Sequence, residues 1–379
     1  MMMECGHPYI AICPPKPPVT LDEDEFGLWI GETLVRKFTW RNINNVEVQV
    51  ITYGATITSI KLPSASGAVD DIVMGFDNME GYLNPLNPYF GATVGRVANR
   101  VGNAKIYIDH NTYNVSANIG QHSLHGGFKG FDKVNWNHYV CGTKVVMTYL
   151  SKDMEEGYPG DVLVQVSFEL TDDNEFLIDF KATSTKPTYV NLTNHSYFNL
   201  AGHNKGVEEL LKHEVCINAD KITEVDKDSI PTGKLLPVEN TVFDLRIPTT
   251  LGKVIDKIPG YDGFDHNFCV NQPSKPQEVF VARVFHPPTG RAMEVYSNQP
   301  GVQFYNSNFI PEDPKKYQGD KSKLKTLVGK GGCHYYKNGA LCLETQNWPD
   351  AINHVNFPPA VLYPGEAYHH TVKYKFFVN

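Results

Sequence analysis

The feature that most constrains the fold is the alternation of apolar and polar residues between positions 161 and 184. In "DVLVQVSFEL" every second residue from Val162 to Leu170 is apolar, and in "FLIDFKATS" the same holds from Phe176 to Ala182. Successive side chains of a β-strand point to opposite faces, so this period of two predicts two half-buried strands. The "TDDNE" between them is typical of a turn. We therefore expect an antiparallel hairpin with one face on a core.

The same alternation recurs along the chain, whereas helical periodicity is scarce. Further strands are expected at residues 46–52, 143–150, 279–286, 292–297 and 370–379. The best candidate for a helix is the short segment "GVEELLKHE" that begins at Gly206. With 31 glycines and 25 prolines between many short strands, the pattern predicts an all-β protein, a large antiparallel β-sandwich or a barrel.

The first 26 residues differ in composition from the rest. They are rich in proline and then in acidic residues, which predicts a flexible N-terminal extension, and we expect residues 27–379 to form a single domain. Glu4 stands where a signal peptide carries a basic residue, so no signal sequence is expected. No run approaches 18 consecutive apolar residues, and we therefore expect no membrane span.

Charge and cysteine content narrow the class of protein. A net charge of -8 repels phosphate backbones, so nucleic acid is not expected as a partner. The seven cysteines are odd in number, widely spaced and without a CxxC pair. This pattern is typical of reduced thiols and predicts a cytoplasmic protein.

Five short stretches combine polar residues with glycine turns or aromatic neighbours. They are "GRVANR" (95–100), "QHSLHGG" (121–127), "NHSYFNL" (194–200), "GFDHNF" (263–268) and "LETQNWPDA" (343–351). Taken singly, each fits an ordinary role: Arg96 and Arg100 as surface charges, or His125 as a turn histidine. Together they offer planar donors and acceptors, aromatic rings, and histidine or carboxylate groups for acid/base work, which is what a sugar site needs.

Two other kinds of site receive weaker support. His122 and His125, with His195 and His266, could be metal ligands, but their spacing does not suit a strand pair and no cysteine or carboxylate cluster completes a set. The G-x-S-x-G turn of a serine nucleophile is absent. We expect neither a metal nor another cofactor.

The ordered motifs also carry a resemblance. With "GRVANR", "SLHGG", "LTNHSYFNLAG", "FDHNF", "PGVQFYNSNF" and "LETQNWPDA", the sequence resembles the aldose 1-epimerases, or galactose mutarotases, from about residue 27 to the C-terminus. The resemblance implies a single large β-supersandwich and a small-molecule aldohexose as partner. The implied reaction interconverts the α and β anomers of hexoses such as D-galactose and D-glucose by acid/base-catalysed ring opening and reclosure. We expect a monomer or a weak dimer.

Carried over position by position, the resemblance implies catalytic and substrate-binding residues. His195 would be the general acid and Glu344 the general base. The positions that match the family's sugar-binding residues are Asn99, Arg100, His125, Asp265 and Gln303, with Tyr197 lining the same pocket. No role is implied for His122.

The chemistry sets conditions on the acid and the base. Glu344 must be ionised and His195 protonated, so we expect their surroundings to move the two pKa values apart in that order, with a carboxylate such as Asp265 holding the proton on His195. In "VNLTNHSYFNLAG" we expect Asn191 and Asn194 to support His195 through buried hydrogen bonds, because unpaired buried polar groups are costly.

Two rival interpretations remain at this point. One is a sugar-binding module without catalysis, although a matched acid and base would serve no purpose there. The other is a glycoside hydrolase or lyase that uses Asp265 and Glu344 as a pair of carboxylates.

Overall fold

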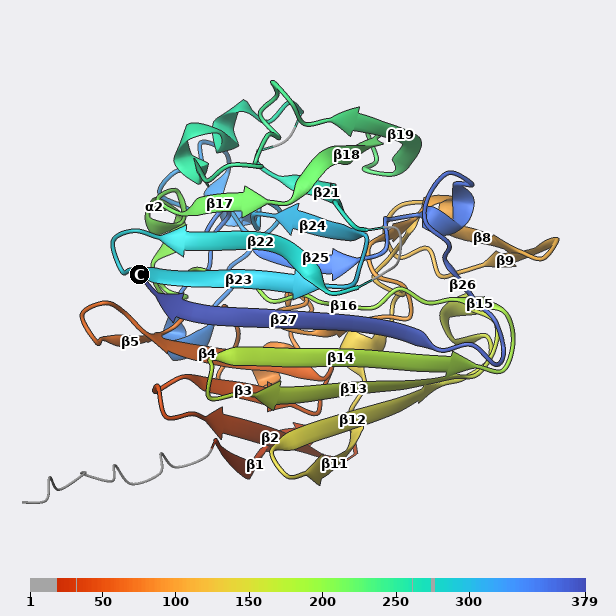
Figure 1. Ribbon diagram of the computed structural model, residues 1–379, viewed down its shortest axis with the longest axis horizontal. Helices are drawn as coiled ribbons and strands as arrows, with labels where there is room; N and C mark the ends of the chain where they lie inside the picture. The colour runs from red at the N-terminus through yellow and green to blue at the C-terminus, as the bar shows by residue number, and fades with distance from the viewer. Residues whose placement is uncertain (1–18, 32, 261, 274–276) are drawn as a thin grey trace, which may run out of the picture.

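The hairpin expected between residues 161 and 184 lies inside the largest sheet of the computed structural model, which describes residues 19–31, 33–260, 262–273 and 277–379 (Figure 1). Its strands, β13 (Val162–Leu170) and β14 (Glu175–Ser184), pair antiparallel. On β13, Val162 and Val164 are fully buried, whereas Leu163 between them is 53% exposed. The alternation in the sequence therefore separates a core face from a solvent face.

Nine strands of the described chain form this sheet, and every neighbouring pair is antiparallel. β13 and β14 are joined, in spatial order, by β11 (Asn137–Cys141) and β12 (Lys144–Ser151) on one side and by β27 (Tyr368–Val378), β23 (Arg291–Ser297), β22 (Val279–His286), β17 (Glu214–Ile217) and β20 (Thr249–Thr250) on the other. All the strands expected from alternation in this region are confirmed.

Two five-stranded sheets complete the sandwich over the described ranges. The first contains β1 (Thr20–Trp29), β2 (Thr33–Arg41), β3 (Glu47–Ile51), β4 (Thr56–Pro63) and β5 (Val69–Asp71) in chain order. The second has the order β19 (Pro231–Pro237), β18 (Ala219–Val225), β21 (Asp265–Val270), β24 (Gly301–Tyr305) and β25 (Cys342–Gln346). The three last strands of this second sheet carry polar residues of the predicted site.

Short two-stranded ribbons and two short helices connect the sheets in the part of the chain that the structure describes. The ribbons pair β6 (Thr93–Val94) with β16 (Thr193–Asn194), β7 (Arg100–Val101) with β10 (Ser123–Leu124), β8 (Lys105–Ile108) with β9 (Asn111–Asn114), and β15 (Thr188–Tyr189) with β26 (Val361–Leu362). The helices are α1 (Met79–Tyr82) and α2 (Gly206–Leu210), and α2 is the helix expected at Gly206. Neither helix has the length and hydropathy to cross a membrane.

The core fills the space between the nine-stranded sheet, which faces the viewer in Figure 1, and the two smaller sheets behind it. One continuous cluster of buried residues contains Val48 and Ile57 of the first small sheet, Val164 and Phe180 of the large sheet, and Phe304 of the second small sheet. The prediction of a large antiparallel β-sandwich is confirmed.

The sandwich starts earlier in the chain than the composition indicated. β1 begins at Thr20 and pairs with β2 along its whole length, so residues 20–26 belong to the sheet rather than to the extension in which they were expected. Acidic residues there form ion pairs with basic residues of β2: Asp22 with Arg41, and Glu23 with Arg36. Residues 1–18 of the expected extension lie outside the described residues.

The buried histidine of β27 makes stability depend on pH. His370 is fully buried, with Nε2 2.8 Å from Thr345 Oγ1 and Nδ1 3.1 Å from the Leu192 carbonyl oxygen. Burial lowers the pKa of His370 to about 3, whereas a histidine in an unfolded chain has a pKa of about 6.5. The unfolded chain therefore binds a proton that the folded chain excludes as the pH falls between these two values.

Above a pH of about 6.5 the stabilisation from the buried neutral histidine is fully present. Below that pH we expect His370 to lower the free energy of unfolding by about 1.4 kcal/mol for each pH unit. Urea unfolding of the parent and of His370→Gln at pH 7, 6 and 5 measures the contribution. The free energy of unfolding of His370→Gln should fall less steeply with decreasing pH than that of the parent, by about 1.4 kcal/mol per pH unit. Equal slopes for the two proteins would contradict the assignment.

Candidate active site

The polar run from Asn191 to Ser196 is buried, and its amide side chains are hydrogen-bonded. Asn191 donates to the carbonyl oxygen of Asn347 (3.2 Å) and accepts from the Asn347 N–H (2.9 Å). Asn194 donates to the Gly91 carbonyl oxygen (2.8 Å) and accepts from the N–H and hydroxyl of Ser196. These bonds fix the backbone on both sides of His195, which is the supporting role expected for the two asparagines.

A backbone bridge explains why His195 meets Glu344. Phe198 and Leu341 form an antiparallel bridge, with N–H to carbonyl distances of 2.7 and 2.9 Å. This bridge brings the segment that follows His195 next to the start of β25, the strand that carries Glu344. The Nε2 atom of His195 lies 3.5 Å from Oε2 of Glu344, and the two side chains are only 5% and 3% exposed.

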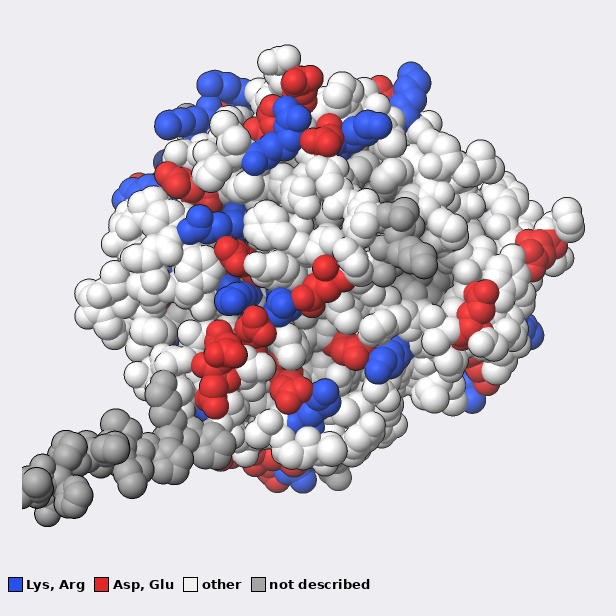
Figure 2. Space-filling view, in the orientation of Figure 1, with Lys and Arg blue, Asp and Glu red and all other residues white. Residues whose placement is uncertain are grey.

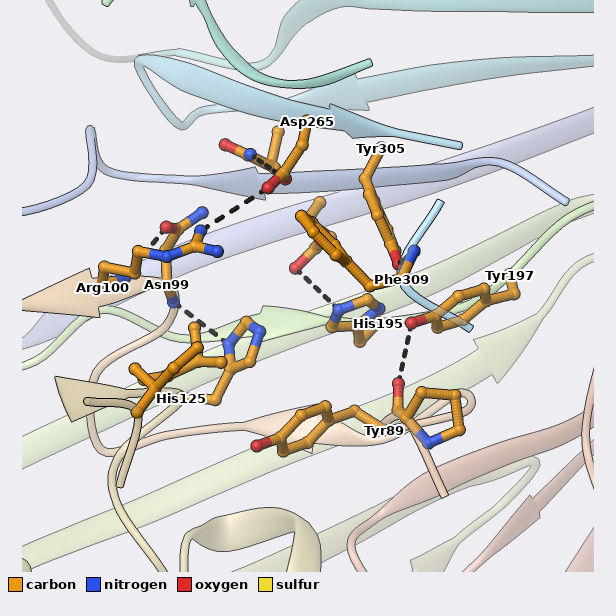
Figure 3. A pocket seen from close by; sticks show the side chains of 14 residues that line it. Tyr89, Asn99, Arg100, His125, His195, Tyr197, Asp265, Tyr305 and Phe309 are labelled. Atoms are coloured by element: carbon orange, nitrogen blue, oxygen red, sulfur yellow. Dashed lines mark hydrogen bonds and ion pairs between the residues drawn. The ribbon is translucent and has the colours of Figure 1, made fainter. Parts of the chain in front are cut away.

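All eight residues predicted for the site line one cavity of about 280 Å³ (Figure 3). They are Asn99, Arg100, His125, His195, Tyr197, Asp265, Gln303 and Glu344. Asp265, Gln303 and Glu344 stand on the adjacent strands β21, β24 and β25, where Gln303 lies directly opposite Glu344. Arg100 is the first residue of β7, whereas His125 and His195 directly follow the short strands β10 and β16.

One wall of the cavity is a connected polar group. Gln303 Nε2 donates to Asp265 Oδ1 (2.7 Å), and Arg100 Nη1 lies 3.6 Å from Asp265 Oδ2. Both charged side chains are almost completely buried. Buried charges that are already paired are held in place, so their remaining donors and acceptors can bind ligand hydroxyls without rearrangement.

The charge state of His195 and Glu344 differs from the expectation. Asp265 accepts a hydrogen bond from Gln303 and pairs with Arg100, so the carboxylate beside His195 is that of Glu344. Burial lowers the pKa of His195 to about 3 and raises the pKa of Glu344 well above its ordinary value, an effect that the negative charge of Asp265 reinforces. The expected order of the two pKa values is therefore wrong, because desolvation disfavours both charges.

The second histidine of the cavity is a neutral hydrogen-bond donor. The Asn99 N–H donates to Nδ1 of His125 (3.1 Å), which leaves the ring proton on Nε2. Burial lowers the pKa of His125 well below its ordinary value, and the neighbouring His195 and Arg100 reinforce this shift.

One cluster of three possible metal ligands occurs among the described residues. It consists of His125, His195 and Glu344, whose ligand atoms lie within 4.8 Å of one another. A metal would need an unprotonated nitrogen from each histidine, but Nδ1 of His125 already accepts a hydrogen bond and Nε2 carries the proton. His122 accepts from the Asn103 N–H at 3.0 Å and does not join the cluster. The donor set therefore fits a metal poorly.

Six further residues line the cavity and were not predicted from the sequence. They are Pro88, Tyr89, Ile119, Leu124, Tyr305 and Phe309. Tyr305 could have been found, because it stands two residues after Gln303 on β24 and so shares its face. Phe309 lies outside the strands but ends the motif "PGVQFYNSNF", whereas Tyr89 lies outside both the strands and the quoted motifs.

Comparisons with known proteins point to one family. The family model described as "Aldose 1-epimerase" matches residues 36–375. The chain belongs to the aldose 1-epimerase family. It is therefore an isomerase with aldose 1-epimerase activity, and its small-molecule substrate is a sugar.

Individual relatives of this aldose 1-epimerase cover nearly the whole chain. The galactose mutarotase of Rattus norvegicus is 46% identical over 361 residues, and that of Bos taurus is 45% identical over the same length. Each alignment covers 95% of this chain and 99% of the relative. The crystal structure of an aldose epimerase homologue from C. elegans superposes with a TM-score of 0.78 at 28% identity, covering 89% of this chain and 97% of the other.

The first arginine of "GRVANR" proves to be structural. Arg96 is 2% exposed, and its guanidinium donates to the carbonyl oxygens of Lys152, Tyr158, Pro159 and Gly160 at 2.9–3.2 Å. The interpretation of this residue as a surface charge is wrong. Its role is to satisfy the backbone carbonyl groups of Lys152 and of the buried residues 158–160.

We expect Arg96→Met to lower the free energy of unfolding by about 3 kcal/mol or more, because several buried carbonyl groups lose their donor. Urea unfolding measures the loss. Arg246→Met is a matched control, since Arg246 pairs with Asp244 at the surface and such pairs contribute about 0–1 kcal/mol. Equal stability of the Arg96 variant and the parent would contradict the structural role.

Proposed function

We propose that this enzyme interconverts the α and β anomers of D-galactose and D-glucose, with Glu344 as general base and His195 as general acid. The observation that carries the proposal is the buried pair of ionisable groups, 3.5 Å apart, on the wall of a polar cavity. The cavity volume of about 280 Å³ is at the lower end of small-molecule sites, roughly 300–1,000 Å³, which suits a monosaccharide. The names of the mammalian relatives support galactose.

Mutarotation requires two coordinated proton transfers. The Glu344 carboxylate takes the proton of the anomeric hydroxyl while His195 Nε2 delivers a proton to the ring oxygen, and the ring opens to the aldehyde. Rotation about the bond between C1 and C2 presents the other face of the aldehyde. Ring closure then reverses both transfers. The reaction consumes no electrons and releases no leaving group.

The burial of the pair matters most in the open-chain intermediate. After ring opening Glu344 has gained a proton and His195 has lost one, so both groups are neutral. This is the state that desolvation favours, since burial raises the pKa of Glu344 and lowers that of His195. The closed-ring complex starts from the charged pair, which the short distance between the two groups stabilises. Burial thus brings the two ends of the proton transfer closer in energy.

The remaining polar groups suit recognition of hydroxyls. Arg100, Asp265 and Gln303 form a connected set of donors and acceptors, and His125 offers its Nε2–H. A hydrolase would need a second carboxylate across the scissile bond as a free acid or nucleophile. The pairing of Asp265 with Arg100 and Gln303 favours hydroxyl binding instead.

We also propose that the enzyme is cytoplasmic and works as a monomer or weak dimer without nucleic acid. All five cysteines among the described residues are free thiols, which agrees with a reducing compartment. On the face shown in Figure 2, acidic and basic side chains are interspersed, and no continuous basic block for a phosphate backbone is visible there.

We expect Glu344→Gln and His195→Asn each to lower kcat by about 10²- to 10⁴-fold with a small change in KM, because each removes one proton-transfer group. This corresponds to about 3–5 kcal/mol of activation free energy. Polarimetry of freshly dissolved α-D-galactose measures the rate, and circular dichroism checks the fold. A correctly folded Glu344→Gln enzyme within tenfold of the parent rate would refute the assignment.

Asp265→Asn serves as a comparison for these two variants. It weakens contacts that the sugar makes in both the ground state and the transition state, so KM should rise. A rise in KM for Asp265→Asn, beside a fall in kcat for Glu344→Gln, separates binding from proton transfer.

We expect the activity to be independent of metal ions, because the ring proton of His125 occupies the nitrogen that a metal would need. The polarimetric rate should be unchanged after incubation with excess EDTA. A loss of rate that zinc or another divalent ion restores would show that the three-residue cluster binds a metal.

A further inference from the structure

Tyr89 contacts both histidines of the catalytic cavity. Its ring centroid lies 5.9 Å from that of His195, with the planes only 14° apart, and 4.6 Å from that of His125, with the planes at 61°. Figure 3 shows the ring beneath the two imidazoles, on the side of the cavity opposite Asp265. No strand or helix contains this residue.

The backbone of Tyr89 is in an unfavourable conformation that directs the ring into the cavity. Its φ of +66° is rare for a bulky residue and costs about 1–3 kcal/mol. The turn is held by its neighbours: the Tyr197 hydroxyl donates to the Pro88 carbonyl oxygen at 2.8 Å, and the Ala92 N–H donates to the Tyr89 carbonyl oxygen at 3.0 Å. Strain that the surroundings maintain in this way is concentrated at functional positions.

The same turn holds the backbone of His195. The His195 N–H donates to the Ala92 carbonyl oxygen (2.9 Å), and the Gly91 N–H donates to the His195 carbonyl oxygen (3.0 Å). Tyr89 therefore sits on a segment that is bonded to His195 from both directions. A displacement of this ring and a displacement of the imidazole are mechanically linked.

The imidazole of His195 is oriented differently from that of most catalytic histidines. In many enzymes a hydrogen bond to the second ring nitrogen sets the ring plane. Within the described ranges, no other residue hydrogen-bonds Nδ1 of His195, and this atom is buried. What the ring does have is two near-parallel aromatic neighbours, Tyr89 at 14° and Tyr197 at 9°.

A cation holds Tyr89 in turn. Lys133 Nζ lies 4.9 Å from the centroid of the Tyr89 ring and 2.6 Å from the Asp132 carboxylate. A cation over an aromatic face is attracted by the ring's negative face. The phenol ring is thus packed against both cavity histidines and anchored by a lysine.

We propose that Tyr89 is a positioning residue that fixes the ring plane of His195 by stacking, so that Nε2 faces Glu344 and the sugar ring oxygen. The proposal rests on the proposed role of His195 as the proton donor. In this enzyme aromatic packing replaces the hydrogen bond that elsewhere orients a catalytic imidazole. The hydroxyl group of Tyr89 has no part in this role, and its aromatic ring is sufficient.

Two substitutions separate the ring from the rest of the side chain. Tyr89→Phe keeps the stacking, and its kcat should stay within about threefold of the parent. Tyr89→Asn removes the ring at a position where asparagine tolerates positive φ, so the fold should be retained. Its kcat should fall about 10- to 100-fold with little change in KM, which is the scale expected for a misplaced catalytic group. Tyr139→Asn, on exposed β11, is the matched control and should match the parent rate.

A double-mutant cycle shows whether Tyr89 acts through His195. In a His195→Asn background the further change Tyr89→Asn should have almost no effect on kcat, because the group that it orients is gone. Additive losses in the cycle, a loss of rate in Tyr89→Phe as large as in Tyr89→Asn, or a rise in KM at unchanged kcat would each overturn the proposal. Circular dichroism and thermal unfolding accompany every variant.

The same measurements distinguish this proposal from the proposed function. If His195→Asn keeps the parent rate, the role of His195 fails and the positioning role fails with it. If His195→Asn loses activity while Tyr89→Asn keeps its kcat, the proposed function stands and only the positioning role is refuted.

Discussion

The site depends on keeping an imidazole and a carboxylate out of water at 3.5 Å from each other. Burying an isolated charge costs several kcal/mol, so neither group would be charged there alone. Their proximity makes the charged pair accessible, and their burial makes the neutral pair accessible. Proton transfer to and from a sugar ring needs both states within reach. In a solvent-exposed pair both groups would stay charged, and the charged and neutral states would not be close in energy.

The sandwich supplies the geometry for that pair through backbone pairing. The bridge between Phe198 and Leu341 joins the segment after the polar run to the start of β25, and the side chains of His195 and Glu344 lie 3.5 Å apart beside it. The strands β21 and β24 lie beside β25 and bring Asp265 and Gln303 to the same cavity. Because hydrogen-bonded strands keep a fixed spacing, the sheet holds Asp265, Gln303 and Glu344, for which we propose binding and catalytic roles, at fixed distances from one another.

The sequence indicated much of this, for identifiable reasons. Strand patterns such as that of Val162–Leu170 are visible because one face of each strand is buried. The eight site residues could be chosen from the sequence because their motifs resemble those of a family, and the fold brings all eight to one cavity. The start of β1 was missed because an acidic edge strand resembles a solvated extension, and only its pairing with basic residues of β2 shows otherwise. Tyr89 was missed because no periodicity marks a residue in a turn.

The sequence by itself determined the all-β class, the positions of the main strands and, through ordered motifs, the family, and it predicted His195 and Glu344 as the acid and the base. These follow from local patterns that a linear chain displays. Only the tertiary structure decided that Arg96 is buried and Arg100 lines the cavity, and that Glu344 rather than Asp265 stands beside His195. It also decided that desolvation lowers the pKa of His195 and raises that of Glu344, which favours the neutral form of each group. The reason is physical: burial and the distance between charges arise when segments far apart in the chain pack together, and no single segment encodes them.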